Sequence, residues 1–157
     1  MYQSKIELED ATPEDAMVVS LLLRKEDIAE IRAVGVKRTT EEAVRESIQM
    51  SDWVKLAYAD NELIAVFGVV KYDHGHTPWM LGTVNLENHP AAVARVSKVM
   101  RDRMLKDTSY LFNWVHAKHH KAIKWLRWLG FSVQKHSPVA SHTGELFYHF
   151  YIGDSDV

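Results

Sequence analysis

Residues 109–131, SYLFNWVHAKHHKAIKWLRWLGF, are the segment that most constrains the fold. An apolar run from Tyr110 to Val115 predicts a short strand. A polar junction separates it from an amphipathic helix that ends at Gly130. Because such a strand and such a helix each need a partner for their apolar face, the segment predicts a layered protein that contains both helices and strands.

The remaining hydrophobic patterns predict the other elements of the chain. Helices are expected from Thr12-Pro13 through the apolar run Met17–Leu23, from Lys25 to Val34 before Gly35, from Thr39 to about Met50, and from Pro90 to about Asp107. Strands are expected around Ile6 and Leu8 and at Trp53–Ala59, Leu63–Tyr72, Trp79–Leu86, Phe131–Ser137 and Leu146–Ile152, with turns at Asp60–Glu62 and Asp73–His76 and a loop at Pro138–Gly144. A hairpin-led sheet with late helices packed on it predicts one domain, residues 1–157, of the α+β or mixed α/β layer class.

The composition excludes several classes of protein. No run approaches the roughly eighteen apolar residues of a membrane-spanning helix, so no span is expected. The start, MYQSKIELED, lacks the charged and apolar regions of a secretory signal peptide. The chain has no cysteine, which excludes disulfides and thiolate metal sites.

Charge is divided unevenly along the chain. Residues 1–90 hold nine Lys/Arg and sixteen Asp/Glu, a balance of −7, whereas residues 91–157 hold ten and five, a balance of +5. A basic second half can steer an anionic ligand, and it is also what a set of helices with solvated basic faces produces.

The segment Ser109–Phe131 resembles the late motif of the GNAT superfamily of N-acetyltransferases, which runs Asn-x-x-Ala-x-x-Leu-Tyr-x-x-x-Gly-Phe and helps to hold acetyl-CoA. Counting back eleven positions from Gly130 places His119 at the Asn of the motif, Ala122 at its Ala, and Trp125 and Leu126 at its Leu-Tyr pair. The order of expected elements is similar to this fold along the whole chain, and YADNELIAVFGVV resembles its second and third strands. The resemblance implies a GNAT-like α+β fold: a mostly antiparallel, twisted sheet of about seven strands with helices on both faces, and acetyl-CoA as cofactor if the protein is active.

In that family the fourth strand leads into a long helix through a loop of pattern Gln/Arg-x-x-Gly-x-Gly/Ala, whose backbone N–H groups cradle the pyrophosphate. The corresponding segment, Leu86–Ala92, contains no glycine, Glu87 adds a negative charge, and Pro90 lacks an N–H. Asn88 or His89 is expected as a plain helix cap. The helix N-terminus then favours only weak anion binding, so tight acetyl-CoA binding is not expected. If acetyl-CoA is bound at all, the resemblance places it against Leu86, Asn88, His89, Ala91, His119 and Ala122.

The catalytic groups implied by the resemblance are only partly present. The family's frequent general acid is a Tyr, and its position holds Leu126, which cannot transfer a proton. A general base for an amine is expected among Asp, Glu or His residues near the cleft. The candidates are Glu87, Asp73, His76 and His116, of which Glu87 and His116 are the predicted catalytic residues. For each, the other interpretation is a solvated acid at a strand end or a hydrogen-bonded core histidine.

Two further patterns lie in the same segment. His116-x-x-His119-His120 has ligand-like spacing, but it spans a strand-to-helix junction with no carboxylate close by, so no metal site is predicted. The residues Lys118, His119, His120, Lys121, Lys124 and Arg127 form a basic cluster interleaved with Trp125 and Trp128. The cluster fits a surface for phosphate, nucleic acid or an acidic protein, or a solvated helix face whose tryptophans point to the core.

Four stretches are similar to the internal virion protein A family of short-tailed, autographivirus-type bacteriophages: RKEDIAEIRAVG, VMRDRMLKDTSYLFNWV, IKWLRWLGF and ELFYHFYIG. That resemblance implies a virion-associated or assembly-related protein without the glycine-rich loop, located in the host cytoplasm or the virion, with virion or host proteins as partners.

Three hypotheses follow, in this order. The first is a phage GNAT-like protein that has lost acetyl transfer. The second is an active, diverged N-acetyltransferase that uses acetyl-CoA. The third is a nucleic-acid or host-protein interaction module that uses the basic second half of the chain.

Overall fold

A single mixed sheet organises the computed structural model, which describes residues 4–35 and 37–155. Its seven strands lie in the order β1-β2-β3-β4-β5-β7-β6, and every neighbouring pair is antiparallel except β4 and β5. The strands are β1 (Ile6–Asp10), β2 (Trp53–Ala59), β3 (Glu62–Tyr72), β4 (Gly75–Gly82), β5 (Tyr110–His116), β6 (Ser132–Ala140) and β7 (Leu146–Gly153).

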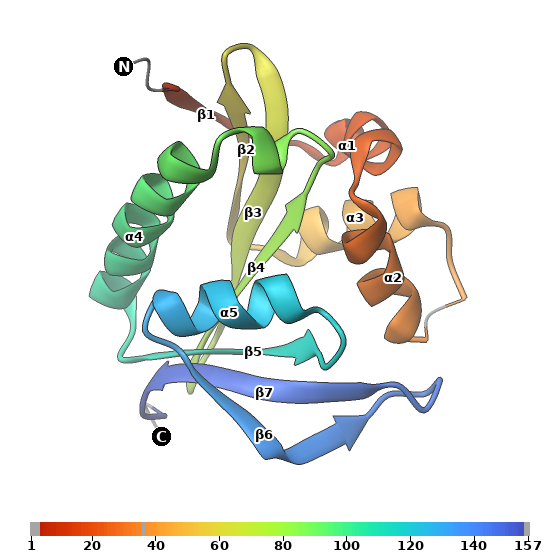
Figure 1. The fold of residues 1–157 in the computed structure, drawn as a ribbon, viewed down its shortest axis with the longest axis vertical. Helices are drawn as coiled ribbons and strands as arrows, with labels where there is room; N and C mark the ends of the chain where they lie inside the picture. The colour runs from red at the N-terminus through yellow and green to blue at the C-terminus, as the bar shows by residue number, and fades with distance from the viewer. Residues whose placement is uncertain (1–3, 36, 156–157) are drawn as a thin grey trace.

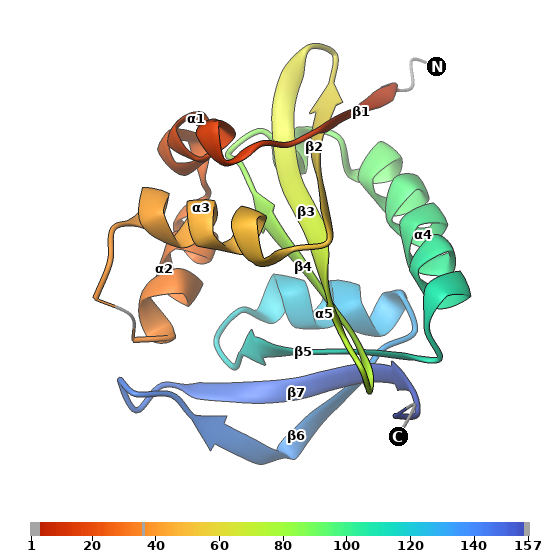
Figure 2. The same cartoon turned by 180° about the vertical axis from the view of Figure 1, so that it is seen from behind.

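Helices cover both faces of this sheet (Figures 1 and 2). One face carries α4 and α5, and the other carries α1 and α3, with α2 beside β5. The helices are α1 (Ala16–Leu22), α2 (Lys25–Ala33), α3 (Thr40–Met50), α4 (Pro90–Asp107) and α5 (His120–Trp128); two short 3-10 turns, η1 (Pro13–Asp15) and η2 (Leu86–Asn88), precede α1 and α4. The expected α+β class, with a mostly antiparallel sheet of seven strands and helices on both faces, is confirmed.

Each face has its own hydrophobic core. On one side, Met100 and Met104 of α4 and Ile123 and Leu126 of α5 pack in one cluster with β-strand residues such as Leu111. On the other side, the helical residues Val19, Val44 and Ile48 pack with Val54, Leu56, Leu63 and Val66 of β2 and β3. The two clusters share no buried residue, so the sheet separates two independently packed layers.

Local sequence signals fix the ends of several elements. The β2–β3 hairpin turns at Asp60 and Asn61, both of which adopt positive φ, as a tight hairpin turn requires. Helix α3 begins with a reciprocal cap, in which the Thr39 hydroxyl accepts from the Glu42 N–H and the Glu42 carboxylate accepts from the Thr39 N–H. Gly130, at φ +97°, takes the left-handed conformation that ends α5.

The sheet forks between β4 and β5. These parallel strands are registered at one pair of described residues, His76 and Leu111, and then diverge. Pro78 lies two residues beyond that pair and has no N–H to offer to a ladder. Its carbonyl instead accepts a hydrogen bond from Asn113 Nδ2 at 2.8 Å, so a side chain replaces the missing strand contact at the base of the fork.

Two expected boundaries were wrong. The strand expected at Trp79–Leu86 occupies Gly75–Gly82 instead, because its ladder with β3 begins at the Tyr72–Gly75 pair, in what was expected to be a turn. The loop expected at Pro138–Gly144 begins later, because β6 resumes its pairing with β7 through Val139 and Ala140 after an irregular stretch. Among the described residues, no helix is long and apolar enough to cross a membrane.

We expect Asn113→Asp to weaken the base of the fork. The substitution keeps the shape of the side chain but removes the donor to the Pro78 carbonyl, which costs about 1–3 kcal/mol of unfolding free energy when the acceptor is left without a partner. Urea unfolding measures this loss. The control is Asn61→Asp in the exposed hairpin turn, where the same chemical change should leave the unfolding midpoint close to that of the parent. Equal effects of the two substitutions would contradict the role given to Asn113.

Candidate active site

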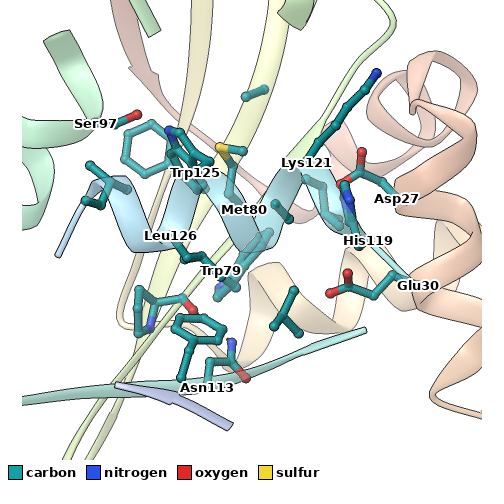
Figure 3. Close-up of a pocket in the computed structure, with 18 of the residues that line it drawn as sticks. Asp27, Glu30, Trp79, Met80, Ser97, Asn113, His119, Lys121, Trp125 and Leu126 are labelled. Carbon is teal, nitrogen blue, oxygen red and sulfur yellow. Dashed lines mark hydrogen bonds between the residues drawn. The ribbon is translucent and has the colours of Figure 1, made fainter. Parts of the chain in front are cut away.

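A cavity of about 850 Å³ lies at the fork (Figure 3). Its walls on one face of the sheet come from α4 and α5, including Ser97, Met100, Trp125 and Leu126. Its walls on the other face come from α2, α3 and β6, including Glu30, Ile31, Ser47 and Val139. Because residues from both faces and from both diverging strands line one space, the cavity passes through the sheet where the strands separate.

The backbone of β4 presents polar groups to this opening. The Pro78 carbonyl faces β5, since it accepts the Asn113 side chain. Strand alternation then directs the N–H and C=O of Met80 toward the same side. No strand residue pairs with Met80 across the fork within the described chain. The Met80 N–H is therefore a donor set into an otherwise apolar wall.

Glu30 is the principal titratable group of the cavity. It extends from α2 toward the space between His119 and the end of β5 (Figure 3). Burial, followed by the negative charge of Asp27, raises the pKa of Glu30 to about 7, and the backbone N–H of His116 and the charge of Arg24 oppose this shift. A carboxyl group that titrates near neutrality is suited to accept a proton at physiological pH.

Asp27 and Arg24 form a buried ion pair beside Glu30. Arg24 Nε lies 2.7 Å from Asp27 Oδ2, and both side chains are almost fully shielded from solvent. The backbone N–H of Arg24 donates to the Gly82 carbonyl at the end of β4. These contacts fix the guanidinium at the edge of the cavity, which it lines together with Asp27.

The residues that lead into α4 are η2 and the N-cap residue His89, and none of them is a glycine. His89 occupies the N-cap position of α4 without a side-chain cap, and its buried ring bonds Ser4 Oγ through Nδ1 at 2.6 Å. Leu86 is buried and lines the cavity, while Asn88 and Ala91 are exposed. Glu87 lies at the rim with half of its side chain exposed, 2.8 Å from Lys121 Nζ and 3.5 Å from Arg24 Nη1.

The motif positions at the start of α5 also line the cavity. His119 is buried there, and burial lowers its pKa, which favours the neutral ring. Ala122, Trp125 and Leu126 follow along the same helix and line the same space. The hydrocarbon side chain of Leu126 faces the cavity, and no proton donor stands at that position.

The other predicted base candidates lie outside this cavity. Asp73 is exposed in the β3–β4 turn, and His76 pairs with Leu111 at the closed end of the fork. His116 lines a second cavity of about 500 Å³ with residues such as Lys118 and Glu145, and its Nε2 lies 3.7 Å from the Glu145 carboxylate. His119 lines both cavities, so the two spaces adjoin at this residue.

The basic cluster of α5 is divided by the fold. Lys121 pairs with Glu87 and Glu26, and Lys118 pairs with Glu145. Trp125 turns inward to the cavity, whereas Trp128 remains exposed under the ammonium of Lys98, 4.4 Å from the ring centroid. Within residues 4–35 and 37–155, no three His, Asp or Glu side chains gather as metal ligands.

Glu30, Asp27 and Arg24 were not among the residues that the sequence indicated. Positions 27, 30, 31 and 34 share one face of α2, and all four line the cavity. The sequence did contain a signal for this site: Asp27 and Glu30 lie on the face of the helix that was expected to bury Ile28, Ile31 and Val34. Its meaning depends on where α2 docks, which the sequence pattern does not show.

Known structures share this architecture. The spermidine N-acetyltransferase from Vibrio cholerae, solved with CoA and spermine, superimposes with a TM-score of 0.69 at 10% identity over 95% of each chain. The aminoglycoside acetyltransferase AAC(6')-Ib, solved with coenzyme A, gives 0.66 at 13% identity over 95% of each chain. An acetyltransferase of the GNAT family from Streptococcus pneumoniae gives 0.63 at 14% identity over 96% of this chain and 99% of the other.

The chain therefore has the fold of the GNAT acetyltransferases. No protein-family model matches its sequence, and a sequence comparison with curated proteins finds no match.

We expect Glu30→Gln to change how stability depends on pH. In the folded protein the pKa of Glu30 is about 7, so the carboxyl keeps its proton up to that pH, whereas in the unfolded chain it loses the proton near its ordinary pKa of 4.5. Raising the pH through this window therefore favours unfolding of the parent, by on the order of 2 kcal/mol, and Gln removes that contribution. Thermal or urea unfolding at about pH 5 and about pH 8 should show the variant gaining stability relative to the parent at the higher pH.

Glu26→Gln on the same helix is the matched control. The pKa of Glu26 is lowered, chiefly by a backbone hydrogen bond, so this group stays ionised across the window and should contribute no slope. An equal slope in the parent and in Glu30→Gln would show that Glu30 is not a raised-pKa group.

Proposed function

We propose that this protein is an acyl-CoA-dependent N-acyltransferase that moves an acetyl group from acetyl-CoA to an amine. The observation that carries the proposal is the cavity through the forked sheet, with Glu30 at its α2 side and the Met80 N–H in its wall. A space that opens on both faces allows two substrates to approach the same point from opposite sides. The GNAT fold and the acetyltransferase names of the similar structures support this reading.

The residues at the fork fit a thioester substrate. The walls contributed by α4 and α5 are largely apolar, as an extended acyl-pantetheine arm requires, and Met80 offers a backbone donor at the split. When an amine attacks the thioester carbonyl, negative charge builds on the carbonyl oxygen, and a preset N–H such as that of Met80 stabilises it. The walls on the amine side of the cavity, together with Glu30, then lie on the opposite face of the sheet.

Glu30 supplies the proton transfer. An ammonium must lose a proton before its nitrogen can form the new C–N bond, and the Glu30 carboxylate accepts that proton. As the amine nitrogen bonds to the carbonyl carbon, the C–S bond breaks and its electron pair leaves on sulfur, and the nitrogen releases its second proton to solvent. Thiols have a pKa near 8.5, so a thiolate leaves without full protonation and takes its proton from solvent. For this reason Leu126 at the usual acid position does not prevent transfer.

A second candidate function comes from the segment before α4. Its lack of glycine and the ion-paired Glu87 favour a protein that has lost acyl transfer, as the phage resemblance implies, and that acts as a virion-associated or assembly-related module in the virion or the host cytoplasm. The two candidates differ in one measurable property, because only the enzyme releases free thiol from acetyl-CoA in the presence of an amine. A nucleic-acid module would instead show binding that weakens steeply as salt rises.

We expect thiol release from acetyl-CoA with a panel of primary amines to depend on Glu30. Glu30→Gln should lower kcat/KM by about 10²–10⁴-fold, because a positioned base contributes that much to the rate. In the parent, the rate should rise with pH through about 7 as Glu30 ionises, and the variant should lose this limb of the profile. Full activity of the variant with the pH limb intact would assign the base elsewhere, and His116→Ala and Glu87→Ala would then be the next substitutions to measure.

We expect Ser97→Phe to block acetyl-CoA. Ser97 is a partly buried residue of α4 whose side chain points into the cavity, so a phenyl ring there fills space that the acyl arm needs (Figure 3). Calorimetry at millimolar acetyl-CoA should show binding to the parent and at least tenfold weaker binding to the variant, a change of about 1.4 kcal/mol. Ser132→Phe, at an exposed position of β6, is the control. No binding to the folded parent at this concentration would overturn the proposed function and favour the second candidate.

A further inference from the structure

An ion-pair network spans the rim of the cavity. Glu87 of η2 lies 2.8 Å from Lys121 Nζ on the first turn of α5 and 3.5 Å from Arg24 Nη1, which precedes α2. All three residues line the cavity. Since η2, α5 and the residue before α2 are separate parts of the chain, the Glu87 carboxylate is the point at which three walls of the cavity meet.

The two cations are held in place differently. Arg24 is shielded from solvent, and its Nε is fixed by the buried Asp27 carboxylate, so Nη1 is directed toward Glu87. Lys121 is an exposed side chain that also reaches Glu26 at 3.6 Å. The hydrogen bond and the charge of Glu87 raise the pKa of Lys121, which identifies Glu87 as its main partner. The Arg24 guanidinium is therefore held in one position, whereas the Lys121 ammonium can change partners.

The bridging carboxylate can be exchanged for a stronger anion. Glu87 and Lys121 are each more than half exposed, and ion pairs between exposed side chains hold weakly. A phosphate group carries more charge and more acceptor oxygens than a carboxylate, and guanidinium groups bind it with directed N–H donors. The first turn of α4 begins three residues after Glu87, and the positive end of its helix dipole adds to the field at the rim.

We propose that Arg24 and Lys121 form a phosphate site whose resident counter-ion is Glu87. A diphosphate ligand takes the place of the carboxylate on the two cations, and Glu87 swings out of the rim. When no ligand is present, the Glu87 carboxylate occupies the site. The side chains of Arg24 and Lys121 then bind the diphosphate in place of the backbone N–H groups that a glycine-rich loop would supply. That the ligand is the diphosphate of an acyl-CoA rests on the proposed function, whereas the exchange itself does not.

Glu87→Gln tests the exchange. The substitution removes the competing charge with little change of shape, so binding of inorganic pyrophosphate and of CoA at low salt should become about three- to thirtyfold tighter by calorimetry. Glu41→Gln, which removes the same charge on α3, is the control and should change neither affinity by more than about twofold. Unchanged or weaker binding to Glu87→Gln overturns the proposal.

Lys121→Met tests whether the Lys121 ammonium binds the phosphate groups. Pyrophosphate binding to this variant should weaken about tenfold or more. Lys124→Met removes the same charge at a residue of α5 that does not line the cavity, so it should have a much smaller effect. Equal losses in the two variants would mean that the ligand senses only the overall charge of the helix. Thermal unfolding of each variant checks that the fold is retained.

Pantetheine, which has the acyl-carrying arm but no diphosphate, separates the two proposals. If Glu87→Gln tightens pyrophosphate binding while no amine accepts an acetyl group and pantetheine does not bind, the phosphate site stands and the proposed function fails. If acetyl transfer occurs but Glu87→Gln leaves CoA affinity unchanged, the phosphate site fails and the proposed function stands.

Discussion

The divergence of β4 and β5 determines what this fold can contain. A continuous sheet satisfies its backbone groups within its own ladder and leaves no space between strands. Here the two parallel strands meet at His76 and Leu111 and then separate, and Pro78 removes a donor at the place where a ladder would continue. The Asn113 amide satisfies the exposed carbonyl at the base. The cavity, the direction of the Met80 N–H and the access from two faces all follow from this local break in pairing.

The charges around the fork form a connected set. Asp27 is held by Arg24, and burial, followed by the negative charge of Asp27, raises the pKa of Glu30 to about 7. Arg24 also reaches Glu87, so one guanidinium contacts both Asp27 and the carboxylate at the rim of the cavity. Substitution of Arg24 would therefore disturb both contacts together, and effects measured there should not be added to those of its neighbours.

The sequence predicted the elements better than the site. The strand and helix around Tyr110 and Gly130 lie where their hydrophobic periods placed them, and the Asp60–Asn61 hairpin formed from its turn residues. These features are local, so a local pattern is sufficient. The start of β4 was missed because the residues GHTP carry no apolar alternation, although their backbone pairs fully with β3.

The cavity residues depended on tertiary placement instead. Glu87 was recognised as a charge in an unusual place, but its partners Lys121 and Arg24 are 34 and 63 positions away along the chain, and no spacing rule connects them. Glu30 became significant only because α2 docks against the open end of β5. His119, Ala122 and Leu126, which the resemblance to the GNAT motif singled out, line the cavity, and their contact with acetyl-CoA stays a prediction.

The division of the interior into two clusters with no shared residue has an evolutionary consequence. Substitutions among Val19, Val44 and Ile48 repack only the layer beneath α1 and α3, and the layer beneath α4 and α5 keeps its own contacts. Substitutions can thus accumulate in one of the two layers during evolution while selection preserves the packing of the other. Under the proposed function, such a partition permits the layer on the amine side to vary while the layer on the thioester side stays constant.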